Sequence, residues 1–210
     1  IMMNIGEKPI LSTHGVVTSL AWKIGGHVNY VLEGNLNYTG AVITWLKDDL
    51  ELISSAAETE ALANKAVKED GLYLVPAFSG LGAPYWDSDA RAAIVGMSRT
   101  TRKAELVRAA LECIAYQITD VVKAMSEDSK ICIGQLCVDG GPTRNAYLMQ
   151  FQSDLLTADV MVPNAEELSA IGPAYAAGLR LGLWDETIFT KLKRTAYKPS
   201  MEDKKRTQKY

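Results

Sequence analysis

The sequence predicts an α/β protein with a mixed β-sheet and helices on both of its faces. Three β-rich segments open the chain, a long amphipathic helix pattern covers residues 100–126, and strand and helix patterns alternate over residues 131–183. Antiparallel strands followed by strand–helix units are the element order of a mixed sheet with a right-handed crossover. We expect one domain over residues 1–184 and a C-terminal tail over residues 185–210.

The first part of the chain is predicted to form a β-meander. Residues 1–5, 15–24 and 27–32 are short β-rich segments, and the turn-forming sequences GEKP and Gly25-Gly26 separate them. Three antiparallel strands are the simplest account of this pattern.

Two helices are expected next. Apolar residues at helical spacing predict an amphipathic helix over residues 37–52, with Trp45 half buried. A second helix, over residues 54–68, is predicted to be capped by Ser54 or Ser55, and its acidic first turns suit the positive end of the helix dipole.

A loop rich in glycine, proline and aromatic residues lies between two further predicted strands, at residues 72–77 and 92–97. Its sequence, FSGLGAPYW, ends in Tyr85 and Trp86. These rings either anchor the loop by burial and one hydrogen bond each, or form part of a ligand surface. The sequence leaves both interpretations open.

The long helix at residues 100–126 is expected to cross a core, because its apolar positions recur over roughly six turns. Hydroxyl groups and a cation stand beside its start, at Ser98, Arg99, Thr100 and Thr101. Such a start either caps the helix or receives a phosphate, and the residue types alone do not separate the two roles.

The rest of the chain is organised around ICIGQLCVDGGPTRNAYLMQFQSDLL, residues 131–156. A short apolar, β-prone run breaks at Asp139, Gly140 and Gly141, and apolar residues at helical spacing follow at once. A strand, a glycine turn and a helix N-terminus in that order form a natural anion or nucleotide site. The reason is that glycine lets a ligand approach the backbone, and the first N–H groups of a helix point outward.

Another strand is predicted at residues 159–162, and a helix at residues 165–183. This helix is unusually rich in alanine and glycine, which favours close packing against another backbone or a ligand. The charged segment after Trp184 is interpreted as a solvated tail.

The composition is that of a soluble globular protein, with 48% hydrophobic and 22% charged residues, a net charge of −3 and a pI near 5.5. This balance gives no reason to expect a nucleic acid or an anionic membrane as partner. No apolar run approaches the roughly 18 residues of a transmembrane span, and no secretory signal is visible, so a cytoplasmic location is expected.

The cysteines are odd in number and have apolar neighbours, which indicates reduced thiols packed in a core: Cys113, Cys132 and Cys137. No metal site is expected from them, since neither His14 nor His27 is close in sequence.

Ile1 stands in a run typical of the middle of a buried strand, which indicates a fragment of a longer polypeptide. The sequence leaves open whether the protein forms a homo-oligomer.

Four segments carry a resemblance to a known family: VNYVLEG, VPAFSGLGAPYWDSDARAAIVGMSRTT, RAALECIAYQ and VDGGPTRNAYLMQFQSDLL. In order and without large gaps from about Ile1 to Trp184, the chain resembles the C-terminal domain of the FGGY carbohydrate kinases, and most of all the members that act on glycerol. A match of this extent is far more specific than an isolated glycine motif.

The resemblance implies a ribonuclease-H-like fold of the actin, Hsp70 and hexokinase type, in which two such domains hold ATP and substrate between them. This chain would be the second domain, without its N-terminal kinase domain. In the family, the aspartate that acts as base, a Gly-Thr-Gly phosphate turn and most substrate contacts lie upstream of the position of Ile1. The resemblance therefore assigns no catalytic residue to this chain.

What remains is the nucleotide half of the site. By the resemblance, Gly141 and Asn145 lie against the adenosine. Gly140 shapes the turn, and Asp139 fixes the loop near the phosphates or their Mg²⁺. The start of the long helix also contacts the nucleotide in the family, and Thr100 stands there in place of the usual glycine. The amide of Asn145 suits contact with the adenosine because it can both donate and accept hydrogen bonds.

The function implied is transfer of the γ-phosphoryl group of Mg-ATP to a primary hydroxyl of glycerol or a related polyol, with the protein supplying position and charge stabilisation. One alternative is a kinase for a pentulose or another polyol. The other is an inactive module that binds a nucleotide or a partner, because Thr100 departs from the family pattern and Pro142, Thr143 and Arg144 stand where the resemblance implies small aliphatic residues. A plain dinucleotide-binding domain is disfavoured, since Gly140-Gly141 lacks a third glycine at the expected spacing.

Overall fold

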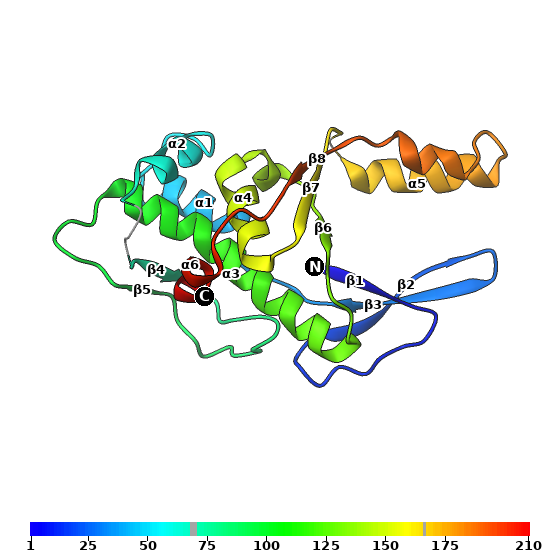
Figure 1. The fold of residues 1–210 in the computed structure, drawn as a ribbon, viewed down its shortest axis with the longest axis horizontal. Helices are drawn as coiled ribbons and strands as arrows, with labels where there is room; N and C mark the ends of the chain where they lie inside the picture. Colours follow the sequence, from blue (N-terminus) through cyan, green and yellow to red (C-terminus); the bar gives the residue numbers. More distant parts are fainter. Residues whose placement is uncertain (68–70, 166) are drawn as a thin grey trace. The chain divides into compact units, whose positions relative to one another are not determined.

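The structure is a computed structural model, and it describes residues 1–67, 71–165 and 167–210 (Figure 1). The predicted second helix ended at residue 68 and the predicted alanine-rich helix included residue 166, and both of these residues lie outside the described part.

The chain divides into two compact units. Unit 1 comprises residues 1–133 together with Tyr210, and unit 2 comprises residues 134–209. Each unit combines helices with β-strands, so the α/β class is confirmed.

Unit 1 begins with the strands β1 (Met2–Gly6), β2 (Val17–Ile24) and β3 (His27–Glu33). Both β1 and β2 pair with β3 in the antiparallel sense, which confirms three antiparallel strands. The predicted meander order is wrong, because β3 lies between β1 and β2. The tight Gly25-Gly26 turn makes β2 and β3 neighbours, whereas residues 7–16 form a connection too long for a hairpin turn.

The remaining elements of unit 1 follow the predicted order. They are α1 (Gly40–Thr44), a π-helical turn (Trp45–Asp49), α2 (Glu58–Lys65), β4 (Tyr73–Val75), β5 (Ala93–Val95) and α3 (Lys103–Ser129). The predicted serine cap of α2 is wrong, because Ala57 occupies the N-cap position. The Glu58 carboxylate instead accepts a hydrogen bond from the Ser54 N–H at 2.9 Å.

The helix α3 crosses a core, as predicted. A cluster of buried side chains joins β1, β3, the connection between β1 and β2, the aromatic loop and α3: Met3, Val16, Leu32, Ala83, Val121, Ala124 and Met125. Cys113 is also buried in α3, where burial raises the pKa of its thiol, but Cys132 and Cys137 are exposed. The prediction that all three cysteines pack in a core is therefore wrong for the last two.

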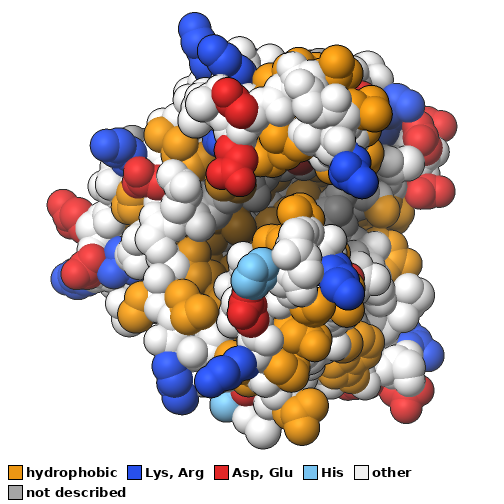
Figure 2. All heavy atoms as spheres, turned by 90° about the vertical axis from the view of Figure 1, so that its right-hand side faces the viewer, with side chains coloured by type: hydrophobic (Ala, Val, Ile, Leu, Met, Phe, Trp, Pro, Cys, Tyr) orange, Lys and Arg blue, Asp and Glu red, His pale blue; other side chains and the backbone are white. Residues whose placement is uncertain are grey.

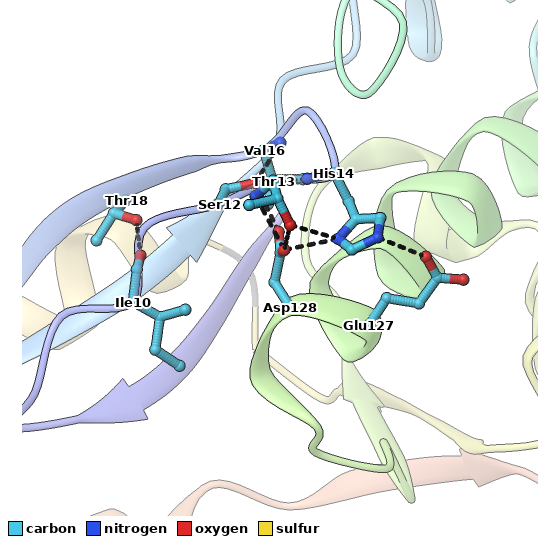
Figure 3. Close-up of polar contacts among 8 residues, drawn as sticks. All are labelled: Ile10, Ser12, Thr13, His14, Val16, Thr18, Glu127 and Asp128. Atoms are coloured by element: carbon cyan, nitrogen blue, oxygen red, sulfur yellow. Dashed lines mark hydrogen bonds and ion pairs between the residues drawn. The ribbon is translucent and has the colours of Figure 1, made fainter.

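A buried carboxylate on the last turn of α3 holds the connection between β1 and β2 (Figure 3). Asp128, whose side chain is 2% exposed, accepts hydrogen bonds from Ser12 Oγ at 2.6 Å and from Thr13 N and Oγ1 at 3.0 Å each. His14 Nδ1 lies 2.7 Å from the same carboxylate, and its Nε2 lies 3.3 Å from Glu127. We call residues 12–14 with Asp128 the loop clamp.

Unit 2 contains a three-stranded mixed sheet in the order β6-β7-β8. The strands β6 (Gln135–Cys137) and β7 (Asp159–Pro163) are parallel, and β8 (Arg194–Tyr197) is antiparallel to β7. The helix α4 (Ala146–Leu156) packs against β7, beside which it lies in Figure 1. Helices on both faces of one sheet stay a prediction.

The C-terminal part of unit 2 contains α5 (Leu168–Arg180), a 3-10 helix (Glu186–Lys191) and α6 (Asp203–Lys209). Within the segment expected to be a solvated tail, residues 194–197 form the strand β8, which pairs with β7, although residues 194–196 are exposed. Asp154 of α4 also holds this segment, because its carboxylate accepts the N–H groups of Ser200 at 2.7 Å and Met201 at 3.1 Å.

Hydrophobic side chains lie at several places on the face of the molecule that Figure 2 shows. In unit 1, Leu20 and Ile24 of β2 are exposed, and in unit 2 Leu181, Leu183 and Phe189 are exposed. Of the helices in the described ranges, none has the length and apolar character needed to span a membrane.

Candidate functional site

The predicted strand, glycine turn and helix are present in unit 2 in that order. The strand β6 ends at Cys137, and the Val138 N–H still donates to the Met161 carbonyl at 3.1 Å. At Gly140 the chain leaves the sheet with φ 95° and ψ 175°. This backbone region is essentially restricted to glycine, so the sequence has its glycine where the turn requires one.

A short 3-10 helix, Gly141–Arg144, joins the turn to α4. Pro142 stands within its first turn, where the fixed φ of proline suits a helix start. Thr143 folds back onto Gly140, because its N–H and its Oγ1 both donate to the Gly140 carbonyl, at 3.1 and 2.7 Å. The glycine turn is thereby closed on itself.

Asn145 occupies the N-cap of α4. Its Oδ1 accepts the Leu148 N–H at 2.9 Å, which satisfies one of the free donors at the helix start and fixes the orientation of the amide. The predicted apolar stripe holds the helix in place, since Leu148, Phe151 and Leu155 are buried. A rigid helix therefore presents the Asn145 amide beside the glycine turn.

The space beside the two glycines is open. A Cβ added to Gly141 would meet no atom within 4 Å, and one added to Gly140 would meet only Pro142 Cδ, at 4.0 Å. Within the part of the chain that the structure describes, the N–H groups of Gly140 and Gly141 donate to no protein acceptor. The turn thus offers two donors and a bare backbone surface to a ligand that carries hydrogen-bond acceptors.

Asp139 lies at the surface just before Gly140. Its carboxylate makes no hydrogen bond or ion pair with the residues described, so other contacts close the turn. Across the described ranges, no group of three or more His, Cys, Asp or Glu side chains is placed to hold a metal ion.

Thr100, the fifth predicted site residue, belongs to unit 1 and is exposed. Its N–H donates to Ser98 Oγ at 3.2 Å, and the two hydroxyl oxygens lie 2.8 Å apart. The helix α3 begins later, at Lys103, where the Arg102 N–H donates to the Glu105 carboxylate at 2.9 Å. The hydroxyls of residues 98–101 therefore close a turn before the helix and do not cap it.

The aromatic loop of unit 1 combines features of both interpretations. Tyr85 donates to Asp120 at 2.9 Å, and Trp86 Nε1 donates to the Gly15 carbonyl at 2.6 Å, so each ring has the single hydrogen bond expected of an anchor. Burial and the bond to Asp120 raise the pKa of Tyr85 to about 12. Tyr85 and Trp86 are nevertheless 56% and 57% exposed, so burial anchors this loop less than the anchoring interpretation assumed.

Sequence reasoning placed four site residues in one turn but missed what closes it. Thr143 was noted only as a departure from an aliphatic pattern. The available signal is a general one, that a threonine hydroxyl can bond a backbone carbonyl three residues earlier.

Comparison with known proteins gives a consistent result. Residues 1–181 match the family model described as "FGGY family of carbohydrate kinases, C-terminal domain". Glycerol kinase of Petrotoga mobilis is 50% identical over 212 residues, which cover 100% of this chain and 43% of that protein. Glycerol kinase of Geobacillus kaustophilus is 48% identical over 213 residues, with the same coverage.

Solved structures agree. Glycerol kinase of Plasmodium falciparum in complex with ADP superposes with a TM-score of 0.91 at 36% identity, covering 99% of this chain and 42% of that chain. A xylulose kinase of Lactobacillus acidophilus superposes with a TM-score of 0.81 at 20% identity, which shows a shared fold. The chain spans 43% of the length of the first two curated relatives.

Proposed function

Because the chain belongs to the FGGY family of carbohydrate kinases and matches its C-terminal domain, we propose that the protein of which it forms part transfers the γ-phosphoryl group of ATP to a hydroxyl of glycerol. The observation that carries this proposal is the near 50% identity to glycerol kinases over the whole chain. We propose the ribonuclease-H-like fold on the same ground, supported by the similarity to the glycerol kinase solved with ADP.

In this proposal, unit 2 supplies the adenosine contact. Gly140 and Gly141 offer open backbone and two N–H donors, and the Asn145 amide is held beside them by its capping bond. A nucleotide carries hydrogen-bond acceptors and a flat base, and both suit such a surface. The residues present therefore fit the ligand.

Mg²⁺ is proposed as the second cofactor. In phosphoryl transfer it bridges phosphate oxygens and neutralises their charge. Asp139 is the carboxylate that this chain offers beside the turn. One carboxylate is enough for a fit, because protein-bound Mg²⁺ usually keeps several waters and takes its other ligands from the nucleotide phosphates.

We assign the catalytic base and the polyol site to the part of the full-length protein that lies outside this chain, since the chain covers 43% of the length of a glycerol kinase relative. This chain would then bind nucleotide without turning over. The alternative of a pentulose substrate gains no support from the xylulose kinase similarity, since 20% identity indicates fold alone.

Two measurements test the proposal. Calorimetric titration of the 210-residue chain with ADP should give saturable binding, and the full-length protein should phosphorylate glycerol faster than xylulose in a coupled assay. Glycerol phosphorylation by the 210-residue chain alone would contradict the assignment of the catalytic base and the polyol site to the rest of the protein. Absence of ADP binding by both proteins would favour the inactive module, and a preference for xylulose would favour the pentulose kinase.

A further inference from the structure

The hydroxyl of Thr143 donates a hydrogen bond to the carbonyl of Gly140, at 2.7 Å. The backbone N–H of the same residue donates to that carbonyl at 3.1 Å. A carbonyl oxygen has two lone pairs, so these two donors saturate it. The peptide unit after Gly140 is therefore fixed in orientation, and the donors of the turn rather than this carbonyl face a ligand.

This bond acts where the backbone is otherwise least constrained. Glycine loses more conformational freedom on ordering than any other residue, and two glycines are adjacent in the turn. Gly140 also adopts φ 95° and ψ 175°, one of several regions that a glycine can populate. A contact that selects this conformation before the ligand arrives removes an ordering cost from binding.

The start of α4 does not need this hydroxyl. Asn145 caps the helix through its own side chain, and buried residues of α4 hold the helix in unit 2. The Thr143 hydroxyl thus acts on the glycine turn alone. The resemblance places a small aliphatic residue at this position, which has no hydroxyl to make the bond.

We propose that Thr143 is a positioning residue of the nucleotide site, whose hydroxyl holds the Gly140–Gly141 turn ready for the ligand. This inference rests on the proposed function, because it assumes that the turn binds nucleotide. It assigns to Thr143 an effect on nucleotide affinity that is separate from the stability of the unit.

The test compares Thr143→Val with Thr143→Ser in the 210-residue chain, with ADP as the titrant in calorimetry. Valine preserves the shape and removes the hydroxyl, so we expect roughly a three- to tenfold weaker affinity for ADP, as expected for one neutral hydrogen bond. Serine restores the donor, so its affinity should stay within about twofold of the wild type. Amide hydrogen exchange at residues 140–144 should become faster in the valine variant only.

Thr190→Val is the matched control. Thr190 Oγ1 donates to the carbonyl three residues earlier, at the same 2.7 Å, in the 3-10 helix Glu186–Lys191. We expect ADP affinity to be unchanged in this variant, and the urea midpoints of all three variants to stay close to that of the wild type.

The outcomes separate the two proposals. If the wild type binds ADP and Thr143→Val binds it equally well, the role of Thr143 is overturned while the proposed function stands. If Thr143→Ser is as weak as Thr143→Val, the hydroxyl is not the cause and the inference is again overturned. If neither the 210-residue chain nor the full-length protein binds ADP, both proposals are wrong.

Discussion

Ser12 Oγ donates a hydrogen bond to the Asp128 carboxylate at 2.6 Å, although 116 residues separate the two in sequence. This contact is the shortest in the loop clamp, and it joins the connection between β1 and β2 to the last turn of α3. The clamp in turn positions Gly15, whose carbonyl accepts the Trp86 indole N–H. A single buried carboxylate therefore organises the packing of two loops in unit 1.

Replacing that carboxylate should cost substantial stability. Asp128→Ala leaves the Ser12 and Thr13 donors without their charged acceptor, so we expect a loss of about 3 kcal/mol in the free energy of unfolding. Urea denaturation at pH 7 measures it. The control is Glu127→Ala, because the Glu127 side chain is 62% exposed and an exposed ion pair contributes roughly 0–1 kcal/mol. Equal effects of the two variants would contradict the clamp.

The clamp should also weaken in acid. Burial raises the pKa of the Asp128 carboxyl, but hydrogen bonds from Ser12, His14 and Thr13 outweigh burial and hold that pKa well below its ordinary value of 3.8. A carboxyl whose pKa is lower in the folded state stabilises the fold above its unfolded pKa, and this stabilisation is lost as pH falls below it.

The stability difference between wild type and Asp128→Asn should therefore be clearly smaller at pH 3 than at pH 5. Urea midpoints at the two pH values measure the difference. A gap that stays constant down to pH 3 would show that the carboxylate charge does not matter.

Gly15 should not tolerate a side chain. A Cβ at this residue would overlap the Pro84 carbonyl oxygen, and the φ of 77° adds strain, so Gly15→Ala should lose about 3 kcal/mol. Gly6 has a similar φ of 79° but no atom within 4 Å of an added Cβ. Gly6→Ala should therefore lose only about 1 kcal/mol, the cost of the backbone conformation. Similar denaturation midpoints for the two variants would disprove the close approach.

Two glycines of α5 should respond in opposite ways. An added Cβ at Gly178 would overlap the Trp184 ring, whereas one at Gly172 would meet no atom within 4 Å. We expect Gly178→Ala to lose about 2 kcal/mol and Gly172→Ala to gain up to about 1 kcal/mol, because alanine is the better helix former. Thermal unfolding followed by circular dichroism reports both, and a stabilised Gly178→Ala would contradict the Trp184 contact.

Asn145 can be separated into a cap and a ligand contact. Asn145→Ala removes both, so it should lose about 1 kcal/mol of stability and most of the ADP affinity. Asn145→Asp keeps the capping oxygen but loses the amide donor and adds a negative charge. Its stability should stay close to that of the wild type while ADP affinity falls about tenfold, measured by calorimetry. Unchanged ADP affinity in the aspartate variant would remove Asn145 from the proposed site.

Local patterns predicted the elements well, because they depend on near neighbours. The helical spacing of Val107, Leu111, Ile114 and Val121 indicated α3, and their burial agrees. The order β1-β3-β2 was not predictable in the same way. In the structure, Asp128 holds residues 12–14 of the connection between β1 and β2, and nothing in the local sequence links Ser12 to a residue so far along the chain.

The glycine turn also combines features that the local sequence predicts with one that it does not. Gly140, Gly141 and Asn145 were predictable, since each is required by its own backbone conformation or its capping position. The bond from Thr143 depends on where the Gly140 carbonyl points, which follows from the three-dimensional turn. β8 was missed because its segment is rich in lysine and arginine, and a strand at the edge of a sheet can carry such charges.

The pairing of β8 with β7 determines how the protein can be shortened for expression. A version that stops at residue 184 would retain Asp139, Gly140, Gly141 and Asn145 but remove β8. The β7 edge would then present unpaired N–H and C=O groups, a template for pairing with another chain. Ser153 Oγ, buried in α4, would also lose the Tyr197 carbonyl as acceptor. Such a shortened protein should aggregate, so a usable C-terminal boundary lies beyond Met201, the last residue bonded to Asp154.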